Sequence, residues 1–407
     1  MTTFVVIVYI IVYLSMLLGG IPGLRVDRTG AALLGAIALL AVGNISEQNA
    51  LASIDVPTLA LLFGLMVVSA QFQLGGFYGI ATKRVVAQDM SPPALLAVVI
   101  SLTGAFSALL TNDVVCLAVA PLLSHLCIEK KLNPVPYLLA LACAANIGSA
   151  TTLIGNPQNI LIGEALKVPF NGYLLIALPP CLLGLLIVWG IIVSLYRGKW
   201  HFETEASLEN TEIEFDRWQT FKGILVLTLL IACFIFTAWP RELLALGAAG
   251  ILMLSRKFHS RKIMGLVDWS LLVLFISLFI VNKAFQLTGG MDWLVAQTKS
   301  AGIPLDQPAP LFISTVILGN LVSNVPAIML LLPIVKGSDV GPLLALSSSL
   351  AGNLIIVGSV ANIIVVESAR QAGIKIDFKT HARVGIPVTL VTLSVTGAWL
   401  WLVSLFS

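Results

Sequence analysis

Apolar segments long enough to cross a bilayer follow one another along most of the chain. The hydrocarbon core of a bilayer is spanned by about 20 apolar residues in a helix. Short polar loops separate the segments, so the pattern predicts a bundle of membrane-spanning helices. The uninterrupted spans are expected near residues 4–20, 28–45, 54–72 and 173–196 in the first half, and near residues 218–238, 240–255, 268–287 and 384–406 in the second.

Two longer apolar segments of the first half are interrupted by small and amide residues. Between residues 92 and 127, two apolar arms meet at a polar tip, residues 111–113, which indicates a hairpin that enters the membrane and returns. The segment 134–167 is broken at residues 155–157. An unsatisfied backbone group in lipid costs several kcal/mol, so a broken helix is expected only where it lines a cavity or is buried in protein.

The second half repeats this order of elements. Its hairpin covers residues 308–335 with a tip at Ser323-Asn324, and its broken span covers residues 341–369. Polar residues recur at matching spacings in the two halves, which predicts an internal duplication. The matched positions are Asp55 with Asp268, Asn112 with Asn324, Pro121 with Pro333, Gly155 with Gly358, Asn159 with Asn362, and Glu164 with Glu367.

The number of crossings predicts that the halves have opposite orientations. Each half has five full crossings and a hairpin, and an odd number of crossings gives an inverted repeat. The loops support this topology, because 18 Lys and Arg residues fall on one side and four on the other. The richer side is expected to be cytoplasmic, which places both termini outside the cytoplasm in an inner (plasma) membrane. We divide the chain into a first repeat, 1–196, an acidic cytoplasmic linker, 197–217, and a second repeat, 218–407.

Composition excludes a soluble globular protein. Of 407 residues 58% are hydrophobic and only 11% are charged, with a mean hydropathy of +0.99. The five cysteines lie inside apolar runs, where we expect small buried hydrophobic side chains. Neither H-E-x-x-H nor G-x-S-x-G occurs, and the four histidines form no plausible metal pair. We therefore expect no catalytic residue, metal site, cofactor or nucleic-acid partner.

Uncharged donors and acceptors gather at the hairpin tips and helix breaks. Half-helix ends there turn toward a common point, where N-termini favour anions and free carbonyls favour cations. Such residues also join helices in membranes, but their recurrence in both repeats favours a substrate site. The candidate substrate-binding residues are Thr111, Asn112, Gly155, Asn156, Asn159, Ser323, Asn324, Gly358, Ser359 and Asn362.

Asp113 breaks the symmetry between the repeats, because Val325 occupies the matching position. A carboxylate inside a membrane is costly, and such groups are functional by default. The alternative is a structural partner for a nearby Lys, Arg or backbone donor. We expect Asp113 to carry the coupling proton.

The Thr-Asn-Asp tip and the Gly-Asn-Pro-Gln-Asn break resemble those of the ion transporter superfamily. This superfamily contains ArsB-type arsenite/antimonite permeases, NhaD-type sodium/proton antiporters and divalent-anion/sodium symporters, and the chain looks most like the ArsB and anion-permease branch. The resemblance implies two hairpins and two broken helices around one substrate site. The dicarboxylate branch has Ser-Asn-Thr at both tips, whereas Asp113 and Val325 stand at the third positions here. A fixed carboxylate beside the site would also repel a dianion.

The implied function is proton-coupled efflux of arsenite or antimonite by alternating access, with a cytoplasmic ArsA-type ATPase as an implied partner. Transport of another inorganic or organic anion, or sodium/proton antiport, is the alternative within the superfamily. A channel fits less naturally, because two hairpins that enter from opposite faces imply alternating access.

Overall fold

The computed structural model describes residues 2–201, 214–335 and 337–406. Helices dominate this part of the chain, which contains only isolated bridges and no extended strand. Seven of its helices are long and apolar enough to cross a membrane. The predicted fold class, an all-α polytopic membrane protein, is confirmed; most of the predicted acidic linker lies outside the described residues.

The described part of the first half contains ten helices, and its hairpin and its broken span lie close to the predicted positions. The hairpin is formed by α6 and α7, and the broken span by α8 and α9. The bounds are α1 (Thr2–Leu18), α2 (Arg28–Ala41), α3 (Glu47–Ser53), α4 (Val56–Leu74), α5 (Phe77–Val86), α6 (Pro92–Leu109), α7 (Asn112–Glu129), α8 (Pro134–Ser149), α9 (Pro157–Ala165) and α10 (Phe170–Leu195).

The second half has the same order of α-helices. Its hairpin is α16 and α17 and its broken span is α18 and α19, with short 3-10 turns at Ser338–Val340 and Ile356–Gly358. The bounds are α11 (Arg217–Phe236), α12 (Arg241–Met253), α13 (Ser260–Met264), α14 (Trp269–Leu287), α15 (Gly290–Ser300), α16 (Pro308–Val322), α17 (Asn324–Leu331), α18 (Gly341–Ala351), α19 (Val360–Gln371) and α20 (Phe378–Ser404).

Matching positions in the two halves make matching local contacts. Asp55 and Asp268 are the N-caps of α4 and α14, and each accepts a hydrogen bond from the backbone N–H three residues later. Such a cap satisfies one of the free N–H groups at a helix start, so both carboxylates stabilise the starts of their helices. Gly76 and Gly289 precede α5 and α15 with φ of 70° and 74°, values that glycine adopts without strain.

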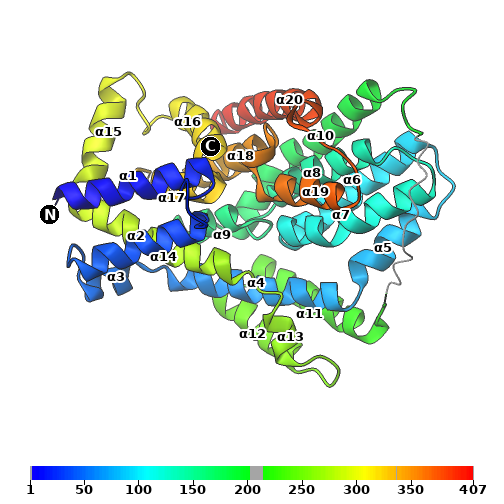
Figure 1. Cartoon of the computed structure of the whole chain (residues 1–407), viewed down its shortest axis with the longest axis horizontal. Coiled ribbons are helices and arrows are strands. Elements are labelled where there is room, and N and C mark those ends of the chain that lie inside the picture. Colours follow the sequence, from blue (N-terminus) through cyan, green and yellow to red (C-terminus); the bar gives the residue numbers. More distant parts are fainter. Residues whose placement is uncertain (1, 202–213, 336, 407) are drawn as a thin grey trace.

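Most of the helices fall into two groups that lie side by side (Figure 1). In the first, α2 packs against α14 and α4 against α12, with α1 and α11 beside them; we call these six helices the frame. The second group, here called the bundle, contains α6 to α10 and α16 to α20, with α8 and α18 near its middle. Each half contributes equally to both groups, so the halves are interleaved rather than separate domains.

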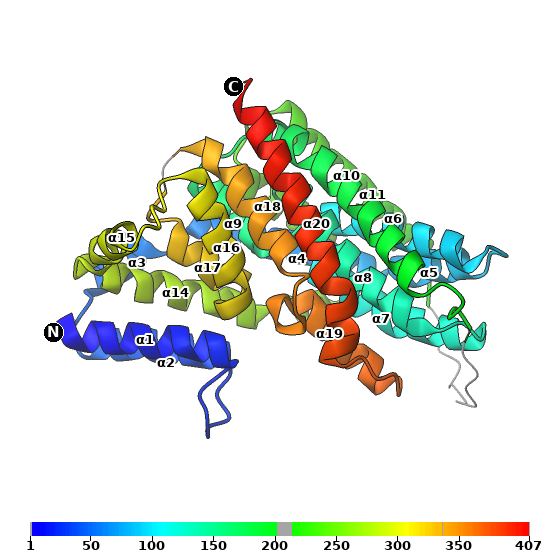
Figure 2. The ribbon, with the colours of Figure 1, turned by 90° about the horizontal axis from the view of Figure 1, so that it is seen from above.

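The last helices of the two halves run antiparallel (Figure 2). The indole N–H of Trp399, near the end of α20, donates to the carbonyl of Ile176, near the start of α10, over 2.8 Å. Further along, a Cβ on Gly184 would lie 3.5 Å from the methyl of Thr392. Equivalent helices that run in opposite directions are what an inverted repeat requires, although the orientation in the membrane stays a prediction.

We predict that both termini lie on the membrane face opposite to the linker, because the positive-inside bias places the Lys- and Arg-rich loops in the cytoplasm. Reporter fusions at the C-terminus and within the linker, as an internal control, measure this. A C-terminal reporter active only in the cytoplasm would contradict the topology and the inverted repeat.

Candidate functional site

The two helix breaks are held open by asparagine side chains. In the first half α8 ends at Ser149 and α9 begins at Pro157. The Nδ2 of Asn159 donates to the carbonyls of Thr152 (2.9 Å) and Ser149 (3.4 Å), which have no helical partner. In the second half the Nδ2 of Asn362 donates to the carbonyls of Gly352 (2.7 Å) and Ile355 (3.1 Å). The contacts occupy identical positions in the repeat.

A close approach of backbone to backbone explains the glycine at the first break. A Cβ on Gly155 would clash with the carbonyl oxygen and Cα of Ser149. The carbonyl of Gly155 in turn accepts the N–H of Asn112 over 3.1 Å, which ties the tip of the first hairpin to the break. The structure therefore brings the first break and the first hairpin tip into direct contact.

Asn146 joins the two halves at the centre of the bundle. Its Nδ2 donates to the Oδ1 of Asn353 (2.8 Å) and of Asn362 (3.1 Å). Its Oδ1 accepts from the Nδ2 of Asn112 (3.3 Å) and the Oγ of Ser359 (2.8 Å). All four hydrogen bonds of this buried side chain are made, which fixes its orientation.

Ser349 occupies the matching position in the second half. Its Oγ donates to the Oδ1 of Asn159 (3.3 Å) and accepts from the Nδ2 of Asn156 (3.0 Å). Each break is thus bonded to the first arm of the broken span in the other half, α18 for the first break and α8 for the second.

Sequence reasoning missed Asn146, Ser349, Asn353 and two residues on the last helices. Tyr173 donates to the carbonyl of Ala150 (2.6 Å), and Nε2 of His381 lies 3.1 Å from the carbonyl of Asn353, again at matching positions. The available signal was the small and polar run at residues 146–152 inside an apolar span.

The hairpin tips carry polar atoms that have no partner among the described residues. The Oγ1 of Thr111 and the Oδ1 atoms of Asn112 and Asn324 are buried and form no hydrogen bond. The Oδ1 of Asn320, on the other arm of the second hairpin, is in the same state. Buried polar groups are nearly always paired, so acceptors of this kind are available to a ligand that carries hydrogen-bond donors.

The remaining predicted residues border the same region. Nδ2 of Asn324 lies 3.3 Å from where a Cβ on Gly352 would stand, and that Cβ would lie 3.2 Å from Cβ of Ser359. Ser323 has φ of 75°, a backbone conformation that is rare outside glycine. Gly358 faces the side chain of Asn320.

Asp113 is half-buried in the first turn of α7 and forms no ion pair with any described residue. The other charged group that acts on its carboxylate is Asp268, the N-cap of α14 in the frame. The alternative of a structural ion pair with Lys or Arg therefore finds no support in the described part of the chain.

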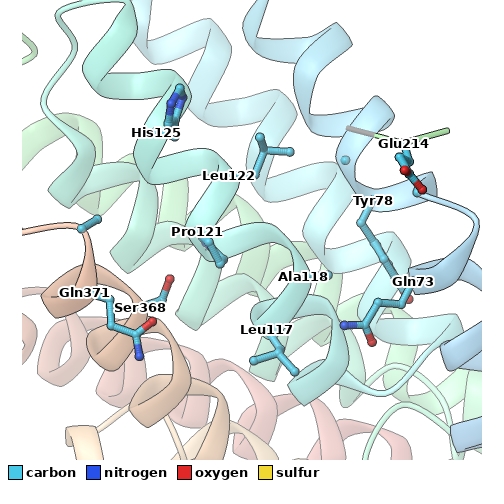
Figure 3. Close-up of a pocket in the computed structure, with 13 residues that line it drawn as sticks. Gln73, Tyr78, Leu117, Ala118, Pro121, Leu122, His125, Glu214, Ser368 and Gln371 are labelled. Carbon is cyan, nitrogen blue, oxygen red and sulfur yellow. The ribbon is translucent and has the colours of Figure 1, made fainter. Parts of the chain in front are cut away.

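A cavity of about 550 Å³ lies between the junction of α4 and α5, the middle of α7, and the end of α19. Figure 3 shows Gln73 and Tyr78 on one wall, α7 residues such as Leu117 and Pro121 in the middle, and Ser368 and Gln371 of α19 opposite. Leu117 follows Asn112 by five residues, about 7.5 Å along a helix. Glu214, within the predicted cytoplasmic linker, also lines the cavity, so the cavity opens on the side predicted to be cytoplasmic.

Known proteins resemble this chain over nearly its whole length. The 46 kDa membrane protein of Mycobacterium leprae is 30% identical and the match covers 93% of this chain and 94% of that protein. The silicon efflux transporter LSI3 of rice (Oryza sativa subsp. japonica) is 28% identical, with 92% of each covered. The putative transporter arsB of Dictyostelium discoideum is 23% identical, covering 91% of this chain and 86% of that protein.

A solved structure and a family model match as well. The YdaH transporter of Alcanivorax borkumensis, described as having an unusual topology, superposes with a TM-score of 0.62 and 16% identity, covering 98% of this chain and 97% of that one, which supports the fold. Residues 7–342 match the family model described as citrate transporter (CitMHS). The chain therefore belongs to the CitMHS family of the ion transporter superfamily, whose members are integral membrane transporters rather than enzymes.

Proposed function

We propose that this protein is a proton-coupled exporter of small undissociated metalloid hydroxides, with arsenite and antimonite as its first substrates. The observation that supports this most is the set of unpaired, buried oxygen atoms at the two hairpin tips, on Thr111, Asn112 and Asn324. Undissociated arsenite carries three O–H donors and no charge. Its hydroxyls would satisfy acceptors that otherwise carry the desolvation cost of buried polar groups.

The charge around the tips argues against a multiply charged anion. No Lys or Arg side chain contacts the tip residues among the described interactions, while the carboxylate of Asp113 stands directly beside them. A dianion or trianion would meet like charge in a site of low dielectric, where repulsion is strong. A neutral hydroxide meets none.

Silicic acid is a second candidate, because one relative is named a silicon efflux transporter. It is also an undissociated hydroxide rich in O–H donors. Citrate, named in the family description, is the contrasting substrate, since it carries several negative charges near neutral pH.

Coupling follows from competition at the first hairpin tip. If the substrate and the proton bound to Asp113 exclude one another, the loaded protein carries one or the other, which is the minimal requirement of an antiporter. By linkage, substrate affinity must then depend on pH. The plasma-membrane location and a partnership with an ArsA-type ATPase remain predictions that this scheme does not require.

Uptake into everted membrane vesicles tests the proposal. With an acidic interior, vesicles that contain the protein should accumulate arsenite and antimonite, and collapse of the pH gradient should abolish the accumulation. Silicic acid, citrate, sulfate and sodium complete the panel. Gradient-driven uptake of citrate or sodium, with none of the hydroxides, would contradict the proposal.

We predict that Thr111→Val weakens apparent arsenite affinity by about 1 kcal/mol, or roughly fivefold, because one hydrogen bond of a desolvated hydroxyl is lost. Thr315→Val is the matched control, since Thr315 is also buried but donates within its own helix to Leu311. Vesicle uptake at varied arsenite concentration measures both. Equal effects of the two substitutions would contradict a role for Thr111 in binding.

We predict that Asp113→Asn keeps substrate binding but loses transport driven by a pH gradient, because the amide preserves size and hydrogen bonding and cannot titrate. Asp292→Asn, at an exposed position in the first turn of α15, is the control that should leave coupling intact. Binding is measured on purified protein and transport in vesicles. Normal gradient-driven transport by the Asp113→Asn variant would make Asp113 structural and require another coupling group.

A further inference from the structure

Each half of the chain carries one acidic and one basic residue at matching positions. Glu164 and Glu367 follow Gly155 and Gly358 by nine residues, near the ends of α9 and α19. Arg241 and Arg28 are the first residues of α12 and α2. The acidic residues belong to the bundle and the arginines to the frame. In the predicted topology, Glu164 and Arg241 lie at the outer face, and Glu367 and Arg28 at the cytoplasmic face.

At the outer face the two charges are paired. The Nε of Arg241 lies 3.0 Å from the Oε1 of Glu164, an ion-pair contact without hydrogen-bond geometry, and its Nη2 donates to the carbonyl of Gly163 over 3.1 Å. The Glu164 side chain is 5% exposed and that of Arg241 16%. Lys167 adds a weaker contact to the same carboxylate at 3.6 Å. A buried ion pair with an additional backbone bond joins bundle to frame at this face.

At the cytoplasmic face the matching charges are apart. Glu367 bonds to Arg370 of its own helix at 2.6 Å, and its side chain is 46% exposed. Arg28 forms no ion pair in the described part of the chain, and its Nε is buried without a hydrogen-bond partner. A buried guanidinium N–H without an acceptor raises the free energy of the folded state. Arg28 would therefore be stabilised by an anionic partner.

The side chains between bundle and frame show the same asymmetry. Met329 of α17 is 3% exposed, and its carbonyl accepts from Asn282 of α14 over 3.3 Å. The matching residue in the first hairpin, Leu117, is 52% exposed and lines the 550 Å³ cavity. The residue that matches Asn282 is Ser69, whose buried Oγ has no partner among the described residues.

Packing of whole helices agrees with these contacts. α9 packs against α4 and α17 against α14, which closes the outer face between bundle and frame. α19 packs instead on α7 and α8, within the bundle, and makes no comparable contact with α14. The structure is therefore closed on one face and open on the other, although the two faces are built from matching residues.

We propose that the two ion pairs alternate during transport: when the protein opens to the outer face, Arg28 pairs with Glu367 while Glu164 and Arg241 separate. This inference rests on the proposed alternating access and names the charged contacts that close each face. The second state is the present one with the roles of the halves exchanged. Loss of one pair is matched by formation of the other, which keeps the two states close enough in free energy to interconvert.

Cross-linking tests the exchange without any substrate. All five native cysteines are first replaced. One variant then carries Glu164→Cys with Arg241→Cys, and another carries Arg28→Cys with Glu367→Cys. Both are treated with a bifunctional thiol reagent whose length matches the span of a paired Arg and Glu side chain. Arg28→Cys with Glu164→Cys, at opposite faces, is the control. Both test pairs should cross-link above the control, and a four-cysteine variant should form either link in a given molecule but not both.

Each link should fix which face is open. With the outer pair linked, a membrane-impermeant maleimide added from the cytoplasmic side should label Leu117→Cys. With the cytoplasmic pair linked, labelling should slow about tenfold or more, as expected when a minor state is all that remains reactive. Met329→Cys, probed from outside, should show the opposite dependence.

Neutralised side chains provide a second readout that needs no engineered link. Glu367→Gln removes the cytoplasmic pair and should speed labelling of Leu117→Cys, whereas Glu164→Gln removes the outer pair and should slow it. The exchange would be overturned if the Arg28 and Glu367 positions failed to cross-link above the control, or if both links formed in one molecule. Equal labelling of Leu117→Cys in the two Gln variants would also overturn it. None of these measurements involves arsenite, so their outcome is independent of the proposed substrate.

Discussion

Two asparagine side chains, Asn159 and Asn362, satisfy the constraint on which this architecture depends. A helix that stops inside a membrane leaves carbonyl groups without partners, and lipid offers none. Each asparagine donates both hydrogens of its amide to carbonyls at the broken end, and its oxygen is held by a side chain from the other half. Because these carbonyls are satisfied, the breaks are stable at the centre of the bundle, and the hairpin tips can pack against them.

The breaks and the hairpins could be predicted because each leaves a mark on the sequence. Gly155, Asn156 and Pro157 interrupt an apolar run, and a polar tip divides a segment too long for one helix. Asn146 and Ser349 could not be identified in this way. They lie inside regular helical turns of α8 and α18, where one polar residue among small ones is typical of ordinary helix contacts. Their importance appears only when the other half of the chain supplies the partners.

The difference between the two faces could not be predicted from the sequence either. Arg28 and Arg241 stand at matching helix starts and would be given the same role by any comparison of the repeats. Within the described residues only Arg241 has an ion-pair partner, because the bundle lies against the frame at one face and away from it at the other. A sequence with two nearly equivalent halves specifies two nearly equivalent arrangements, and a single structure shows one of them. The proposed mechanism of alternating access rests on this near-equivalence.

In the proposed mechanism, a neutral hydroxide and a proton exclude one another at the first hairpin tip. Proton release upon substrate binding measures this directly. When arsenite is added to the purified protein in a weakly buffered solution near neutral pH, the account predicts that protons are released in proportion to the arsenite bound, and that Asp113→Asn binds arsenite without releasing them. Binding of arsenite to the parent protein with no release of protons would contradict the account.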